Sequence, residues 1–207
     1  MTWKATNYSR QLQEAVNDLH TSPVVITGLH ADVVELSLGD LQTCARMSDG
    51  TVACWGGNGD GQLGVGTVTD PIATPLEVSK LGHDVVKVTA GGNHTCALKQ
   101  NGTLWCWGSN LYGQLGAGTF DGDSCRDSDA GTCERAPIEV TALGAEVADV
   151  AAGGAHTCAR KVDGTLWCWG RNLLGQLGTG AVDGVPCPDG SGSFCNPTPQ
   201  RVSVSCR

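Results

Sequence analysis

Short apolar runs alternate with turn residues along most of the chain, at a spacing typical of β-strands. The runs VVKV at 85–88 and VADV at 147–150 predict short strands. Each is followed by two cysteine-containing apolar runs that flank an Asn-Gly or Asp-Gly dipeptide, which indicates a hairpin. A run that begins with proline, PLEV at 75–78 or PIEV at 137–140, predicts a further strand. Such a four-stranded unit is the inventory of a propeller blade, so the pattern predicts an all-β protein built of such blades.

Three motifs recur in a fixed order and divide the chain into repeats. One copy reads GGNHTCAL at 91–98, NGTLWCWG at 101–108 and GQLG at 113–116. A later copy, from 153 to 178, is almost identical, and an earlier one has Gln42 where the other two have histidine. These three to three and a half units are fewer than the ~4–8 blades that close a propeller. The predicted repeats span about 31–82, 83–144 and 145–207.

The first 30 residues fit the repeat less well, and two interpretations remain open. In one, residues 1–30 are a degenerate half-blade, because 7–12 and 23–29 stand where 58–63 and 75–81 stand one period later. In the other, they form a short helical cap, because apolar residues recur there at helical spacing. Those residues are Leu12, Ala15, Val16 and Leu19.

Paired cysteines stand ten residues apart in each repeat and are centred on the predicted turn. With a three-residue loop whose glycine is left-handed, Leu98 faces Leu104 and Cys96 faces Cys106. These cysteines then form a non-hydrogen-bonded pair, whose Cα atoms lie ~4.5 Å apart, a separation that a disulfide tolerates. The spacing therefore predicts three cross-strand disulfides: Cys44–Cys54, Cys96–Cys106 and Cys158–Cys168.

Further cysteines lie in two polar insertions that follow the GQLG motifs. We expect the bridges Cys125–Cys133 and Cys187–Cys195 to staple these loops, which have almost no apolar residues of their own. Cys206 is left without an assigned partner.

Composition narrows the class of protein. The 30 glycines and only 16% charged residues fit a turn-rich β protein, and a net charge of −8 argues against nucleic-acid binding. No apolar run reaches the ~18–20 residues of a membrane helix, so we expect no membrane span. Eleven cysteines favour an oxidising location, extracellular or periplasmic. The start of the chain does not resemble a secretory signal, which leaves a cytoplasmic location as the alternative unless the chain is a piece of a longer exported protein.

Metal sites are not expected. Zinc sites favour Cys-x-x-Cys knuckles, which this chain lacks. The acidic segment 121–129 carries four aspartates that could hold calcium. It lacks the spacing of a hand-type calcium loop, so we interpret it as a solvated loop.

Catalytic residues and cofactors are not expected either. His94 and His156 recur at the same place in their repeats, which suggests a structural role in which a ring nitrogen bonds backbone inside the blade. Phosphate-binding loops and nucleophile elbows are absent from the sequence. The tryptophans also recur and are assigned to the repeat core: Trp55, Trp105, Trp107, Trp167 and Trp169.

The elements HTCAL at 94–98, WCWG at 105–108 and NxxGQLG at 110–116 resemble the repeats of the regulator of chromosome condensation family. The resemblance covers about residues 30–206 and implies a β-propeller, seven-bladed in familiar members, whose loops and rims bind other proteins. The cysteine pairs look most like exported bacterial members. The GWRHT element of the photoreceptor members is replaced by GGNHT and GGAHT, which argues against light sensing.

These observations predict a non-catalytic, exported scaffold that binds another protein. Two alternatives are an exchange regulator of a small GTPase and a propeller-type enzyme inhibitor, both of which exist in the family that the chain resembles. Because the repeats are too few to close a ring, we expect either additional repeats or a homodimer to complete it.

Overall fold

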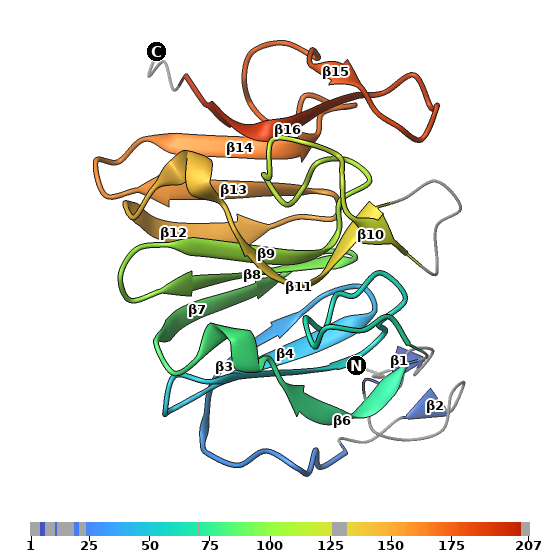
Figure 1. Ribbon diagram of the computed structural model, residues 1–207, viewed down its shortest axis with the longest axis vertical. Helices are drawn as coiled ribbons and strands as arrows, with labels where there is room; N and C mark the ends of the chain where they lie inside the picture. Colours follow the sequence, from blue (N-terminus) through green and yellow to red (C-terminus); the bar gives the residue numbers. More distant parts are fainter. Residues whose placement is uncertain are drawn as a thin grey trace.

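Three antiparallel sheets follow one another along the chain and stack along the long axis of the computed structural model (Figure 1). The structure describes residues 5–6, 11, 19–20, 24–69, 71–125 and 132–203. Each sheet is one blade, and each predicted repeat contains one of them. The all-β architecture of partial-propeller blades predicted from the sequence is confirmed.

The first blade has the strand order β3-β4-β5-β6. The other two have the orders β7-β8-β9-β11-β10 and β12-β13-β14-β16-β15. The strands of the first blade are β3 (Val33–Leu38), β4 (Gln42–Met47), β5 (Val52–Gly56) and β6 (Ile72–Glu77). Those of the second are β7 (Val85–Ala90), β8 (His94–Lys99), β9 (Leu104–Ser109), β10 (Asp123–Ser124) and β11 (Thr132–Glu139). Those of the third are β12 (Val147–Ala152), β13 (His156–Lys161), β14 (Leu166–Arg171), β15 (Val185–Pro186) and β16 (Phe194–Arg201). Two short 3₁₀ turns, η1 (Ser79–Leu81) and η2 (Thr141–Leu143), connect the blades.

The central hairpin of each blade has the register that its turn dictates. In the second blade, Gly102 has φ of 81°, and the Asn101 side chain accepts a bond of 3.0 Å from the Thr103 amide. A β-carbon at Gly102 would lie 2.5 Å from the Ala145 carbonyl oxygen, so the turn requires glycine for space as well as for conformation. Cys96 consequently faces Cys106.

The structure pairs the same cysteines as the spacing analysis. The cross-strand pairs are Cys44–Cys54, Cys96–Cys106 and Cys158–Cys168, each with Cα atoms 4.1 Å apart. The loop pairs are Cys125–Cys133 and Cys187–Cys195, with Cα separations of 5.7 and 5.3 Å. Cys206 lies outside the described residues.

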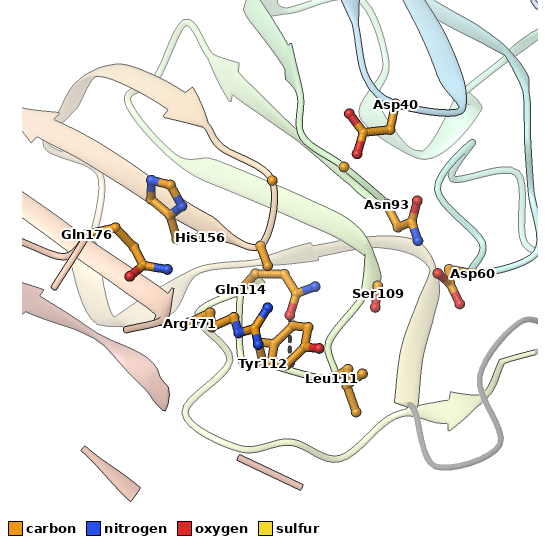
Figure 2. Close-up of a pocket in the computed structure, with 13 residues that line it drawn as sticks. Asp40, Asp60, Asn93, Ser109, Leu111, Tyr112, Gln114, His156, Arg171 and Gln176 are labelled. Atoms are coloured by element: carbon orange, nitrogen blue, oxygen red, sulfur yellow. Dashed lines mark hydrogen bonds between the residues drawn. The ribbon is translucent and has the colours of Figure 1, made fainter. Parts of the chain in front are cut away.

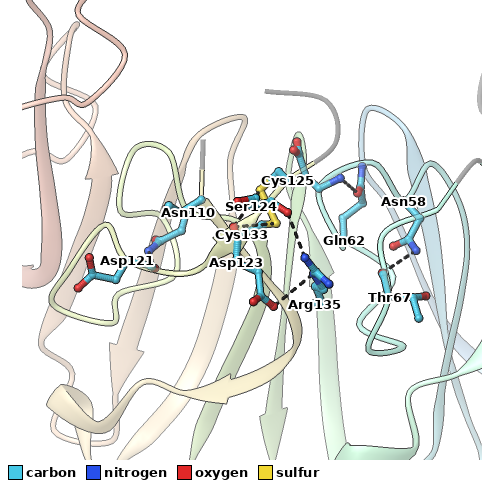
Figure 3. Close-up of a disulfide and its surroundings, with 12 residues drawn as sticks. Asn58, Gln62, Thr67, Asn110, Asp121, Asp123, Ser124, Cys125, Cys133 and Arg135 are labelled. Carbon is cyan, nitrogen blue, oxygen red and sulfur yellow. Dashed lines mark hydrogen bonds and ion pairs between the residues drawn. A yellow bond between two sulfur atoms is a disulfide. The ribbon is translucent and has the colours of Figure 1, made fainter. Parts of the chain in front are cut away.

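Both insertions add a short outer strand that the sequence did not predict. In the second blade, β10 pairs with β11, so that Asp123 faces Cys133 (Figure 3). Arg135 holds this edge, since its Nη2 donates to the Ser124 carbonyl at 3.2 Å and its Nε lies 3.2 Å from an Asp123 carboxylate oxygen. Asp121 and Asp123 therefore belong to a folded edge, whereas positions 127 and 129 of the calcium candidate lie outside the described residues.

The hydrophobic core lies between blades. One face of the second blade, including Cys96 and Leu104, packs with Trp169 of the third blade. Its other face, including Ala97 and Trp107, packs with residues of the first blade. The alternation of a β-strand thus gives the middle blade two apolar faces, and each neighbour covers one of them.

The first 30 residues are described only in part. Ala5–Thr6 (β1) and Leu19–His20 (β2) form an antiparallel pair, so Leu19 is in a strand, and most of the helix candidate lies outside the described residues. Residue 11 contacts the first blade through its backbone carbonyl, which accepts a bond from the Trp55 indole. Across the described residues, no helix has the length and apolar character needed to cross a membrane.

Candidate functional site

The recurring motif residues connect each blade to the next. The indole Nε1 of Trp107 and the hydroxyl of Thr95 both donate to the backbone carbonyl of Gln62 in the preceding blade, each at 2.9 Å. One blade later, Trp169 and Thr157 donate to the carbonyl of Gln114 at 2.9 and 2.8 Å. A single buried carbonyl thereby uses both lone pairs at each junction.

The amide side chains of the GQLG loops hold the loops themselves. The Gln62 side-chain oxygen accepts a bond of 2.9 Å from the Asp60 amide, and Gln114 and Gln176 make the equivalent bonds at 2.8 Å. The Asn58 side chain bonds the Thr67 carbonyl at 2.9 Å. These motif residues are therefore committed to structure.

His94 is buried and bonds across the blade junction. Its Nε2 lies 2.8 Å from the hydroxyl of Thr157, which donates its own proton to Gln114, so the histidine is the donor. The expected bond to backbone inside the same blade is wrong, because the strand end points the ring at the next blade. Burial lowers the His94 pKa to about 3, with a smaller contribution from His156, so the ring is neutral at pH 7.

The equivalent positions in the other blades differ. Gln42 donates to the backbone carbonyls of Gly91 and His94 at 3.2 and 3.1 Å. His156 is only partly buried, and burial lowers its pKa as well.

The tryptophans divide into two groups. The first group is at most 2% exposed and consists of Trp55, Trp107 and Trp169. Trp105 and Trp167 are instead partly exposed, and lysines lie over their rings at 5.2 and 5.9 Å from the centroids. Both still pack against the hydrophobic clusters between blades, so they belong to the edge of the core rather than to its centre.

A cavity of about 570 Å³ opens where loops of all three blades meet (Figure 2). The Gly-Gly-x-His turns and the GQLG loops form its walls, so it lies at the end of the strands opposite the cysteine hairpin turns. Charged and aromatic groups enter it from different blades: Asp40 and Asp60 from the first, Tyr112 from the second, and His156 and Arg171 from the third.

Three repeat positions at this cavity do not hold the same residue in all three repeats, and at each position at least two of the three residues line it. The position before Asn58 and its equivalents is occupied by Gly57, Ser109 and Arg171. Two residues after the same asparagine stand Asp60, Tyr112 and Leu174. Two residues before the histidine position stand Asp40, Gly92 and Gly154. Repeated residues thus build a constant scaffold that presents different side chains at one cavity, a signal that sequence analysis alone missed.

Arg171 and Tyr112 contact each other in the cavity. The guanidinium carbon lies 4.8 Å from the centroid of the Tyr112 ring, a cation–π geometry. Partial burial raises the pKa of the Tyr112 hydroxyl, which also bonds the Asp189 carboxylate. The hydroxyl is therefore protonated at pH 7. Bonds from Ser191 lower the pKa of Asp189, which is therefore a carboxylate at pH 7.

A second hollow, of about 540 Å³, lies on the outer face of the first blade. Its lining is mostly apolar and includes Ile26, Val33, Leu36 and Trp55. Strand β3 leaves Leu36 and Leu38 exposed by 58% and 73%. In the second and third blades, the first strands, β7 and β12, take the place of β3 and pack against the preceding blade.

Blades of this topology, joined by a repeated carbonyl bond, define a β-propeller repeat protein. Two models of the regulator of chromosome condensation (RCC1) repeat match the chain, one at 33–62, 85–114 and 147–176, the other at 49–98, 101–160 and 163–205. The chain therefore belongs to the RCC1 repeat family.

Relatives with known names include the ultraviolet-B receptor UVR8 of Arabidopsis thaliana, which is 35% identical over 161 residues, 76% of this chain and 34% of the receptor. The E3 ubiquitin-protein ligase HERC2 of Homo sapiens is 33% identical over 192 residues, 90% of this chain and 4% of the ligase. The chain thus spans about a third of one relative and a small part of the other.

Solved structures agree on the fold. Yeast RCC1 (Prp20), in its complex with Kap60, superposes with a TM-score of 0.71 at 19% identity, covering 96% of this chain and 43% of that one. Human WBSCR16 superposes with a TM-score of 0.69 at 22% identity, covering 94% and 45%.

Proposed function

We propose that this chain is a non-catalytic scaffold that binds another protein through the cavity shared by its three blades. The observation that carries the proposal is the gathering of non-repeated side chains at one cavity of a repeated scaffold. Repeat proteins use extended surfaces of this kind for binding, because each unit contributes one stretch of the surface. The family's loops and rims serve the same purpose in the members that the sequence resembles.

The histidines support a binding rather than a catalytic role. His94 is buried, neutral and bonded to Thr157, so it is not placed to exchange protons with a substrate. His156 lines the cavity but recurs from the same motif, where its ring packs on Gly153.

The cysteines support an oxidising compartment, and we propose an extracellular or periplasmic location. All ten cysteines that the structure describes stand in pairs. Disulfides of this density persist outside the reducing cytosol.

We further propose that more RCC1-type blades, from further chain or from a second copy, cover the apolar outer face of the first blade. Support comes from Leu36 and Leu38, whose exposure contrasts with the covered inner strands of the next two blades. An exposed patch of this kind marks a contact surface in soluble proteins.

Site-specific photo-crosslinking tests the binding face. A photoreactive residue at position 111, in the cavity wall, is expected to capture a discrete protein from the fluid surrounding the producing cells. The same residue at position 162, whose valine is 70% exposed at the opposite end of the strands, is the control. Equal capture at both positions, or capture at 162 alone, would contradict the proposal. Release of nucleotide from a small GTPase upon addition of the chain would instead favour the exchange-regulator alternative.

A further inference from the structure

Among the described residues that line the cavity, the one arginine or lysine comes from the third blade. Arg171 stands at the end of β14, at the position that Gly57 and Ser109 occupy in the other blades. The preceding glycine, Gly170, has φ of 103°, and a β-carbon there would lie 2.7 Å from the Ala155 carbonyl oxygen. This fixed backbone aims the next side chain into the cavity, where Figure 2 shows the guanidinium beside the Tyr112 ring.

The charge of Arg171 is held in place without a direct ion pair among the described residues. Its Nε is buried and has no hydrogen-bond partner, and within the described part of the chain no carboxylate forms an ion pair with it. Asp189 lies close enough to influence it, but that carboxylate accepts bonds from the Ser191 amide at 3.0 Å and the Ser191 hydroxyl at 2.7 Å. Because Nε is buried, a ligand in the cavity would bond the guanidinium through its terminal nitrogens.

Geometry selects the anion. The guanidinium is a planar fork that bonds a carboxylate through two parallel hydrogen bonds, and stacking on Tyr112 limits its rotation. Figure 2 places Asp40 on the other side of the cavity, so the wall near Asp40 repels an anion while the wall near Arg171 attracts it. Because the whole chain carries a charge of −8, a polyacidic ligand is repelled at long range.

We infer that Arg171 binds the carboxylate of a single aspartate or glutamate side chain in an extended, otherwise non-acidic segment of the protein partner. This inference rests on the proposed binding function and names the chemistry that the partner presents. Gln176 lines the cavity near Arg171, and because only its side-chain oxygen holds the loop, its amide nitrogen can donate to the same carboxylate.

A random dodecapeptide library selected on the full chain provides the probe. We expect the selected peptides to share one acidic position, and we expect Arg171→Gln to weaken their binding at least 10-fold by fluorescence polarisation. Arg171→Lys keeps the charge but not the fork, so it should lose part of this affinity. Arg201→Gln removes a positive charge from an exposed position of the same blade and should leave binding unchanged.

A double-mutant cycle identifies the contact. Glu→Gln in the peptide and Arg171→Gln in the protein should each cost at least 10-fold, and the two together should cost little more than either alone. Additive losses, or full binding by Arg171→Gln, would overturn the carboxylate inference. If Arg171→Gln left binding intact but Leu111→Arg in the cavity wall abolished it, the carboxylate inference would fail and the proposed function would stand. Failure of both variants to affect binding, or failure to select any peptide, would contradict both. Unchanged thermal unfolding of the variants shows that the comparison concerns folded protein.

Discussion

The indole Nε1 of Trp55 donates a 2.7 Å hydrogen bond to the backbone carbonyl of Gln11. This contact repeats, one blade earlier, the bonds of Trp107 to Gln62 and of Trp169 to Gln114. A β-carbon at Gly56 would also lie 2.9 Å from the Gln11 side chain, and one at Gly108 would lie 3.2 Å from the Gln62 Cα. Gln11 thus takes the place of the loop that supplies the acceptor carbonyl in a preceding blade. The half-blade interpretation aligns residue 11 with residue 62, so it predicts this contact. Most other residues of the N-terminal segment lie outside the described residues.

The threonine at each junction provides a matched pair of substitutions. Thr95→Val should cost about 1 kcal/mol, because Trp107 still satisfies the Gln62 carbonyl. Thr157→Val should cost about 1–3 kcal/mol more, since it also leaves the buried His94 Nε2 without an acceptor. Chemical denaturation of the two variants measures the difference. Equal losses would show that the His94 bond contributes nothing.

His94 should make the fold sensitive to acid. Its folded pKa of about 3 lies below the ordinary value of 6.5, so between these pH values the unfolded chain binds the extra proton. Stability from this group is therefore fully present above pH 6.5 and is lost progressively as the pH falls towards 3. The effect is on the order of a few kcal/mol.

The first repeat has glutamine at the position of His94, and this substitution tests the pH dependence. His94→Gln should fall less in stability than the natural chain between pH 7 and pH 4, because Gln42 shows that an uncharged amide fits the equivalent position. His83→Gln, at an exposed position, serves as control and should behave like the natural chain. An unchanged pH profile in His94→Gln would refute the assignment.

Peptide mapping without reduction should find the cysteines joined within hairpins, as in Cys96–Cys106 and Cys158–Cys168. Opening one of these bridges should cost less than the ~3 kcal/mol expected for a 15-residue loop, because the closed loop is shorter. Free thiols at these positions in protein purified under oxidising conditions, or links between blades, would contradict the register and the proposed location.

The apolar outer face of the first blade should drive association of the isolated chain. Leu36→Lys with Leu38→Lys should shift its sedimentation towards the monomer, because both side chains lie on the face that lacks a covering blade. Leu174→Lys, at a residue that is 85% exposed on another loop, is the control. A natural chain that is a monodisperse monomer at high concentration and unfolds cooperatively would contradict the need for further blades.

Local geometry explains which features the sequence predicted. The register that joins Cys96 to Cys106 depends on one turn and a strict alternation of faces, so spacing was sufficient to predict it. The partner of His94 belongs to the next blade, 63 residues away, and depends on how two blades pack. The cavity depends on three blades at once, which is why Arg171 was not among the expected site residues. A comparison of equivalent positions among the repeats, where Gly57, Ser109 and Arg171 differ, was the signal available.

The central claim is that repeated residues hold the scaffold while non-repeated residues at the cavity bind the partner. Saturation substitution of the displayed chain, sorted in parallel for protease resistance and for binding of a peptide selected from the library, tests it at every position. We predict that changes at Gln62, Thr157 and Trp169 reduce protease resistance. Changes at Leu111 and Arg171, which line the cavity, should preserve resistance and abolish binding. The claim would be contradicted if binding were lost only together with protease resistance, or at positions remote from the cavity.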